Sequence, residues 1–158
     1  MYLCTQHQVM GEVNSMQHIL LVIFSAMLMI VACSHTGTSS RQADTLIGTE
    51  WVLEDLGGRG VEDRVQSTII FKADDRIVGW GGCNRYFGGY RFDGQNLDIG
   101  PIGSTRRVCP AVVMDQETRF FQALDKANRI SIEGSYLLIH CEGLDKPLRF
   151  LQLRRTGS

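Results

Sequence analysis

Most of the chain after residue 45 alternates apolar and polar residues with a period of two. The segments "TEWVLEDL" (49–56), "STIIFKA" (67–73) and "RIVGW" (76–80) each fit a strand with one buried face. Two longer alternating segments bend at the pairs Asp93-Gly94 and Glu133-Gly134, which favour hairpin turns. The segment "PLRFLQLRR" (147–155) predicts a last strand with Leu148 and Phe150 on one side. The pattern therefore predicts many short antiparallel strands.

One segment has helical spacing instead. Residues 110–127 place apolar side chains near one face at intervals of three and four, with Glu117 and Phe121 beside that face: Val113, Phe120, Leu124 and Ala127. Pro110 is acceptable in a first helical turn, and Asp115 is a rival start. We therefore expect the α+β class: a mostly antiparallel, strongly curled β-sheet or partial barrel with one inserted α-helix before the last three strands.

The N-terminus has a different pattern. Residues 19–32 form a run of 14 residues without a charge, which is shorter than the roughly 20 residues that cross a bilayer. The length is typical of the apolar core of a secretory signal. The residues before the run hold no Lys or Arg, unlike a usual signal, and Met1, Met10 and Met16 are alternative starts.

The run ends in "IVAC", which resembles the bacterial lipobox, in which the cysteine is acylated after cleavage. We therefore expect a lipoprotein signal peptide at 1–32, a lipid-modified Cys33 with a flexible tether at 33–45, and a globular domain at 46–154. A buried thiol in an uncleaved signal is the alternative for Cys33. Ser34 after the cysteine resembles the pattern sorted to the outer membrane, facing the periplasm.

Charge argues against nucleic acid as a partner. Residues 1–32 hold one acid, Glu12, and no base, so the remainder carries equal numbers of acidic and basic residues. Phosphate neutralisation needs a clustered basic excess, and two arginine pairs, at 106–107 and 154–155, are too small a cluster.

The glycine-rich stretch "GWGGCNRYFGGY" (79–90) lacks the spacing and the Lys-Ser/Thr ending of a phosphate-binding loop. We expect its glycines to permit positive φ, bulges or close backbone approach at bends of a curved sheet: Gly81, Gly82, Gly88 and Gly89.

The ordered series of motifs resembles the META domain, also called HslJ-like. It runs from "LIGTEWVLEDLGG" through "GWGGCNRYFGGY", "LDI", "STRRVCP" and the helix to "ISIEGSYLLI" and "LRF", over residues 46–153. Arg107 departs from the methionine that the family often has there. The matching positions, expected to be structural, are Trp51, Gly82, Cys83, Asn84, Gly88, Tyr90, Thr105 and Cys109. The resemblance implies a small envelope or secreted domain, associated with heat shock and novobiocin resistance, with no established catalytic activity.

Three cysteines belong to the domain. Cys83 and Cys109 each lie in a motif of the family, and in an oxidising compartment we expect a disulfide between them, with two neighbouring buried thiols as the alternative. Cys141 is expected to be a core thiol. His140 beside it should point to the opposite face of its strand, and no Cys-x-x-Cys spacing supports a metal site.

Several polar side chains can be interpreted as structural or as functional. Asn84 is expected to fix a turn, with ligand binding as the alternative, and Thr105 and Arg106 to pair with the bend at 83–84. Glu117 is expected to be the partner of an arginine, and as a lone carboxylate it offers no paired acid–base arrangement. Tyr86, Phe87 and Tyr90 are interpreted as sheet and core aromatics.

Two functions of different classes follow. The first is a monomeric, non-enzymatic lipid-anchored cell-envelope protein, without cofactor or metal, that presents a surface to another envelope component and contributes to stress or novobiocin tolerance. The second is a lipocalin-like module in which the curled sheet holds a small apolar ligand. An interior cavity discriminates between them, because ligand-holding barrels tend to be larger than this domain.

Overall fold

The computed structural model describes residues 45–153, which form the globular domain. The expected signal peptide, Cys33 and nearly all of the expected tether lie outside the described residues. Within residues 45–153 no helix has the length and apolarity that crossing a membrane requires.

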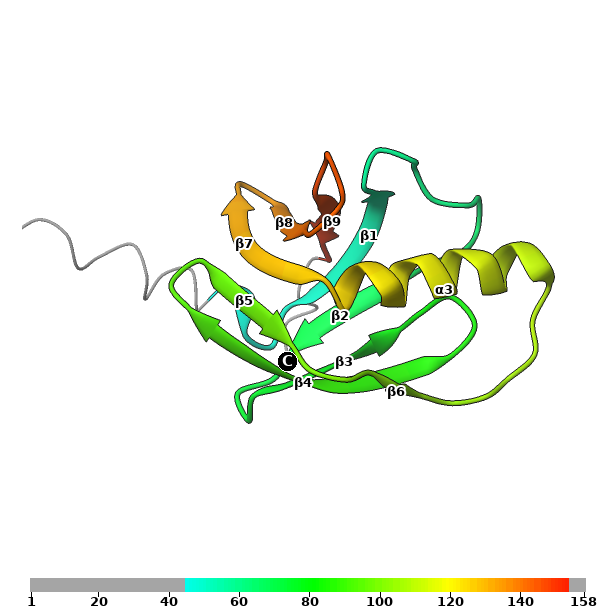
Figure 1. The fold of residues 1–158 in the computed structure, drawn as a ribbon, viewed down its shortest axis with the longest axis horizontal. Helices are drawn as coiled ribbons and strands as arrows, with labels where there is room; N and C mark the ends of the chain where they lie inside the picture. The colour runs from blue at the N-terminus through cyan, green and yellow to red at the C-terminus, as the bar shows by residue number, and fades with distance from the viewer. Residues whose placement is uncertain (1–44, 154–158) are drawn as a thin grey trace, which may run out of the picture. The chain divides into compact units, whose positions relative to one another are not determined.

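Nine strands make one antiparallel sheet that closes on itself (Figure 1). In chain order they are β1 (Glu50–Leu56), β2 (Thr68–Phe71), β3 (Arg76–Trp80), β4 (Arg85–Asp93), β5 (Asn96–Ile99), β6 (Gly103–Ser104), β7 (Ala127–Glu133), β8 (Tyr136–Cys141) and β9 (Leu148–Gln152). The order around the sheet is β3-β2-β1-β9-β8-β7-β5-β4, and the pairing of β3 with β4 completes an eight-stranded ring. The two-residue β6 pairs with β4 outside that ring. The predicted curled sheet is confirmed.

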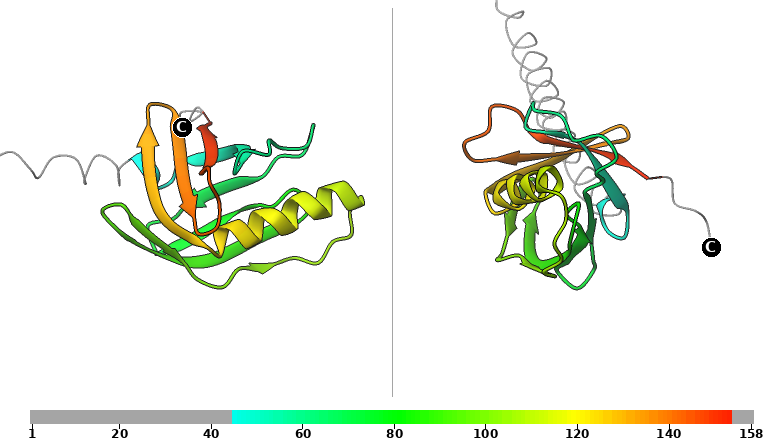
Figure 2. Two further views of the ribbon diagram at one scale, coloured as in Figure 1. Left: turned by 45° about the horizontal axis from the view of Figure 1, so that its top comes forward. Right: turned by 90° about the vertical axis from the view of Figure 1, so that its right-hand side faces the viewer.

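Helix α3 (Ala111–Leu124) lies between the β7–β9 strands and the β3, β4 and β6 strands (Figures 1 and 2). It starts directly after Pro110, as the sequence predicts, and three strands follow it. The predicted end at Ala127 is wrong, because that residue already opens β7. Its buried face consists of Gln116, Glu117, Phe120, Ala123 and Leu124, so two polar side chains are enclosed with the apolar ones.

The inner faces of the strands and the buried face of α3 form a single core. Phe120 contacts Tyr86 of β4 and Phe150 of β9, with ring centroids 5.8 and 6.2 Å apart. The side chain of Trp51 is fully buried, and Phe71 packs edge-on against Tyr90. Large aromatic side chains therefore occupy the interior and join the helix to both sides of the barrel.

Two features of the strand pattern have clear causes. Leu56 is buried although it follows Leu53 by three residues, because the register of β1 against β9 shifts between Leu53 and Asp55. Such a bulge returns an out-of-phase residue to the inner face. The hairpin loops are Gly94-Gln95 and Gly134-Ser135, one residue later than the predicted acid–glycine pairs, and both glycines have positive φ.

The glycine-rich stretch consists of the end of β3, a short turn and the first part of β4. Of the four glycines expected to permit unusual backbone, Gly82 alone has positive φ, at 125°. Gly88 and Gly89 lie where β4 leaves β3 and joins β5, so they mark a bend in the sheet. A further glycine of this stretch, Gly79, lies where the backbone of β2 comes close. A Cβ at Gly79 would be 2.1 Å from the carbonyl oxygen of Thr68. The strands β2 and β3 approach so closely there that only glycine fits.

Candidate functional site

The candidate site lies at the turn between β3 and β4. The amide of Gly81 donates to the carbonyl of Asn84 at 2.7 Å and closes the turn. The side chain of Cys83 and that of Asn84 are both buried, so this turn lies inside the protein and its polar groups need partners there.

Glu117 of α3 supplies those partners. Its Oε2 accepts hydrogen bonds from the backbone amides of Cys83 and Asn84, at 2.9 and 2.6 Å. Its Oε1 accepts from Nδ2 of Asn84 at 2.7 Å. The residue is 5% exposed, and three N–H groups surround the carboxylate, so dipoles rather than a cation balance it. The expectation that Glu117 pairs with an arginine is wrong.

Asn84 extends the network to a third segment. Its Oδ1 accepts from Oγ1 of Thr105 at 2.9 Å and from the backbone amide of Arg107 at 2.7 Å. The amide oxygen faces donors and the amide nitrogen faces a carboxylate, so the orientation of the side chain is fixed by its surroundings. Asn84 is therefore a turn-fixing residue, as expected, and Thr105 pairs with it. Arg106 does not take part; the neighbouring Arg107 does, through its backbone.

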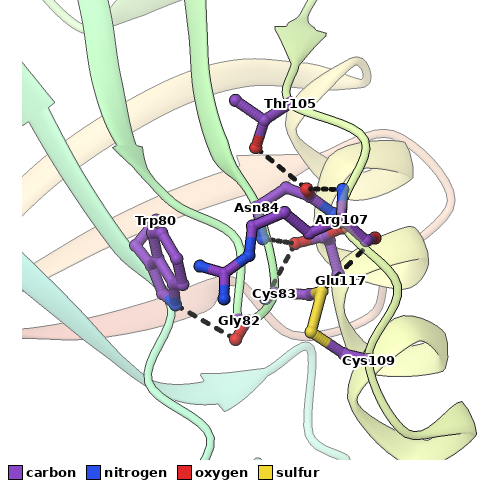
Figure 3. The surroundings of a disulfide bond; sticks show 8 residues. All are labelled: Trp80, Gly82, Cys83, Asn84, Thr105, Arg107, Cys109 and Glu117. Carbon is purple, nitrogen blue, oxygen red and sulfur yellow. Dashed lines mark hydrogen bonds between the residues drawn. A yellow bond between two sulfur atoms is a disulfide. The ribbon is translucent and has the colours of Figure 1, made fainter.

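A disulfide joins the same two segments covalently (Figure 3). The Cα atoms of Cys83 and Cys109 are 6.0 Å apart. The predicted bridge is confirmed, and the alternative of two neighbouring thiols is wrong. The turn, the first half of α3 and residues 105–109 are thus held together by one covalent bond and five hydrogen bonds within a few residues.

Trp80 closes the outer side of this site. Its indole N–H donates to the carbonyl of Gly82 at 3.0 Å. The guanidinium of Arg107 lies over the indole, 5.9 Å from the ring centroid (Figure 3). Arg107, which departs from the resembled family pattern, therefore makes a cation–π contact at this position.

Close packing on the inner side excludes larger residues. A Cβ at Gly81 would lie 2.6 Å from Oε2 of Glu117 and 2.6 Å from the ring of Phe121. Beside the turn, the hydroxyl of Ser67 donates to the carbonyl of Gly81, and Nε2 of Gln116 donates to that hydroxyl oxygen. Both buried polar side chains of α3 are thus used in holding the turn.

The structure brings together some of the predicted positions and leaves others apart. Gly82, Cys83, Asn84, Thr105 and Cys109 meet at this site. Trp51 lies in the core, Gly88 lies in the middle of β4, and the hydroxyl of Tyr90 donates to the carbonyl of Lys72 at 3.0 Å. No local sequence motif indicates the roles of Glu117 and Trp80. The adjacent Gln116 and Glu117 on an otherwise apolar helix face were the available signal.

Cys141 is a separate buried group. It is free, and burial raises the pKa of its thiol to about 12, so the thiol stays protonated at neutral pH. His140 lies on the outer side of β8, where its Nδ1 is 3.4 Å from a guanidinium nitrogen of Arg129. The two side chains therefore do not form a nucleophile–base pair. Burial and the cation of Arg129 lower the pKa of His140.

A small cleft lies away from the site, beside the last turns of α3. Its volume is about 190 Å³, and its lining includes Leu56, Ala123 and Leu144 with the cations Arg59, Arg119 and Lys126. Pockets for drug-sized ligands typically measure roughly 300–1,000 Å³. Among residues 45–153 no three potential metal-ligating side chains gather.

The side chains of the site hold the turn, the helix and residues 105–109 together. Both oxygens of Glu117 and both ends of the Asn84 amide are engaged by groups of the protein itself. A buried network of this kind stabilises one backbone arrangement when every member is satisfied.

Replacing Glu117 by glutamine should therefore destabilise the domain. The amide nitrogen of glutamine cannot accept a hydrogen bond, so a buried donor at residues 83–84 loses its partner, which costs about 1–3 kcal/mol. Urea unfolding of Glu117→Gln measures this loss. Asp115→Asn is the matched control on the same helix, because its exposed ion pair with Arg119 contributes at most about 0.5 kcal/mol. Equal losses in the two variants would contradict the role of Glu117.

The disulfide should also contribute to the stability of the domain. A loop of 26 residues predicts that Cys83→Ser/Cys109→Ser loses about 3 kcal/mol of unfolding free energy, measured by chemical denaturation. Mass spectrometry of the unfolded, non-reduced protein should find one alkylated cysteine within residues 45–153, at Cys141. Alkylation at all three positions would show that the bridge does not form.

The fold and the motifs have known relatives. A family model for the META domain matches residues 44–154. No curated protein matches the sequence. The chain is similar to the NMR structure of a protein from Burkholderia xenovorans, with 24% identity over 78% of this chain and 94% of that chain, at a TM-score of 0.60. A second NMR structure is 20% identical over 68% of this chain and 92% of its own, at a TM-score of 0.56. These likenesses show a shared fold, and because the family model spans more than half of the sequence, this chain belongs to the META domain family.

Proposed function

We propose that this protein is a non-enzymatic, monomeric, lipid-anchored protein of the bacterial cell envelope. Its META domain presents a rigid surface to another envelope component and thereby contributes to heat or envelope stress response and to novobiocin tolerance. The observation that carries the proposal is the Cys83–Cys109 disulfide, which joins the turn between β3 and β4 to the segment before α3. Disulfides persist in oxidising compartments such as the periplasm and are rare in the cytosol.

The N-terminal sequence supports the same location. The apolar run at 19–32 and the "IVAC" motif at 30–33 are typical of an exported lipoprotein, and Ser34 favours the outer membrane. Two or more acyl chains hold a protein on a membrane stably, where one chain gives marginal binding. A lipid at Cys33 would therefore keep the domain at the membrane surface on the periplasmic side.

A binding rather than a catalytic role is supported by how the polar groups of the domain are used. The carboxylate of Glu117 accepts three hydrogen bonds from the turn that it holds. The thiol of Cys141 is buried, with its pKa raised to about 12. A catalytic carboxylate or thiol needs access to a substrate, which these two groups lack.

The alternative of a lipocalin-like ligand module has weaker support. Trp51, Phe71, Phe120 and Phe150 are fully buried in the space that a ligand would occupy. An eight-stranded barrel is just wide enough for side chains to fill it or for one small ligand to be held, and here side chains and α3 fill it. The outer surface is therefore the better candidate for contact with a partner.

The anchor is tested by replacing Cys33. Cells that express the protein and are fed radiolabelled palmitate should incorporate label into the wild-type chain and not into Cys33→Ala. The matched control is Cys141→Ala, which keeps Cys33 and should be labelled like the wild type. Label in Cys33→Ala, with the protein still in the outer-membrane fraction, would defeat the anchor.

The tolerance role is tested in the native bacterium with its own copy deleted. We expect the deletion to lower the novobiocin concentration that inhibits growth, and growth at raised temperature to suffer. The wild-type chain should restore both, and Cys33→Ala should restore them less. A deletion strain that grows like its parent under both conditions would contradict the stress role and leave the anchor result untouched.

A further inference from the structure

Exposed apolar side chains gather on the outer surface next to the disulfide. Phe87 on the outer face of β4 is 61% exposed, although it pairs across the sheet with Val78 of β3. Val108, between Arg107 and Cys109, is 94% exposed. Trp80, half-buried at the end of β3, lies on the same side of the sheet as Phe87, two residues along the strand from Val78. The outer strand positions of a barrel in water are usually polar, so this grouping needs an explanation.

Three arginines surround these side chains. Arg85 pairs across the sheet with Trp80, and Arg107 lies over its indole. Arg106 is exposed on the same segment. In the part of the chain that the structure describes, no carboxylate forms an ion pair with any of the three; the pairs found there are Arg76 with Asp74, Arg119 with Asp115 and Arg149 with Glu54.

We call these residues the basic–aromatic patch: Trp80, Arg85, Phe87, Arg106, Arg107 and Val108. We propose that the basic–aromatic patch is a docking surface for the anionic lipid headgroups of the membrane. None of its three cations makes an ion pair with a carboxylate of the described residues. Their guanidinium groups are therefore available to an anionic partner.

The chemistry of the patch fits a lipid surface. A guanidinium presents a planar fork of donors that matches phosphate oxygens. The indole N–H of Trp80 is held by the carbonyl of Gly82, so this residue offers its ring to the bilayer interface, where tryptophan is enriched. Phe87 and Val108 supply apolar area that headgroups can cover. Three arginines are fewer than the roughly four to eight cations of a segment that binds anionic lipid by charge alone, so the aromatic and apolar side chains have to contribute as well.

The site behind the patch holds it in one shape. The backbone amide of Arg107 donates to Asn84, and the Cys83–Cys109 bridge fixes both ends of the turn and of the segment. Docking therefore does not require the backbone of residues 105–109 to become ordered, which lowers the entropic cost of binding. This gives the Glu117–Asn84 network a functional consequence: it presents Arg107 and Val108 to the membrane.

The inference rests on the proposed function, because an anchor at Cys33 would place the patch within reach of lipid. The 11 residues from 34 to 44 span at most about 36 Å when fully extended. That reach is comparable with the roughly 34 Å across a compact domain of this size, whose expected radius of gyration is about 13 Å. The tether is thus long enough for the domain to turn a chosen face to the bilayer.

The test uses the full chain, reconstituted in vesicles of phosphatidylcholine with or without phosphatidylglycerol, and measures tryptophan emission. Lipids brominated near the headgroup quench an indole that lies at the interface. Trp51 is fully buried and supplies a constant background, which Trp80→Phe defines. We expect Trp80 to be quenched in vesicles with phosphatidylglycerol and much less in phosphatidylcholine alone. Added salt should reverse the quenching, because it screens exposed charges.

Arginine variants identify the patch. Arg85→Gln and Arg107→Gln should each lower the ratio of docked to undocked protein about fivefold, the loss of one cation near an anionic surface. Both changes are at exposed side chains, and Arg107→Gln keeps the backbone hydrogen bond to Asn84. The matched control is Arg129→Gln, at an exposed arginine on β7, which should leave quenching unchanged.

Quenching that is the same in both kinds of vesicle, or the same in Arg85→Gln and Arg107→Gln as in the wild type, would overturn the docking surface. If the true partner is an acidic protein, the emission of Trp80 should stay unquenched in both kinds of vesicle. That result would also overturn the docking surface. Palmitate labelling measures acylation at Cys33 and thereby tests the anchor separately. Quenching that depends on phosphatidylglycerol in a chain without acyl label would support the patch and defeat the anchor.

Discussion

The carboxylate of Glu117 is the group on which the arrangement around the disulfide depends. A charged oxygen pair inside a protein is costly unless donors surround it, and here the amides of Cys83 and Asn84 and the side chain of Asn84 do so. The same contacts satisfy a turn that would otherwise bury unpaired backbone groups. The carboxylate of the helix and the amides of the turn therefore satisfy one another, and each lowers the cost of burying the other.

The contact between Glu117 and the turn positions other parts of the domain on two sides. On the inner side, the position of α3 carries Phe120 into the interior, where it meets β4 and β9 and helps to fill the barrel. On the outer side, Asn84 fixes Thr105 and Arg107, and the disulfide fixes Cys109. One buried network thus links the core to a surface segment that has no regular secondary structure of its own.

This division has a bearing on function. The polar groups of the network bond to one another, while cations without an ion pair and exposed apolar groups lie on the surface that the network supports. A domain built in this way is suited to presenting a rigid surface, and its interior serves stability. The confirmed disulfide is consistent with the export that the N-terminal sequence predicts, because disulfides persist in oxidising compartments.

The sequence by itself determined the class of the fold, because period-two alternation, glycine turns and one helical segment are signals carried by neighbouring residues. It also determined the family, through the order of its motifs, and with the family the pairing of Cys83 with Cys109. Only the tertiary structure decided the role of Glu117. From sequence a lone carboxylate on a helix suggests a cation as its partner, whereas the amides it accepts from lie more than 30 residues earlier. Tertiary structure also decided that β3 and β4 close the ring and that Trp80, Arg85, Phe87 and Arg107 form one surface. Alternation along a strand fixes which side chains face outward, but pairing between strands, which no local pattern encodes, decides which of them become neighbours.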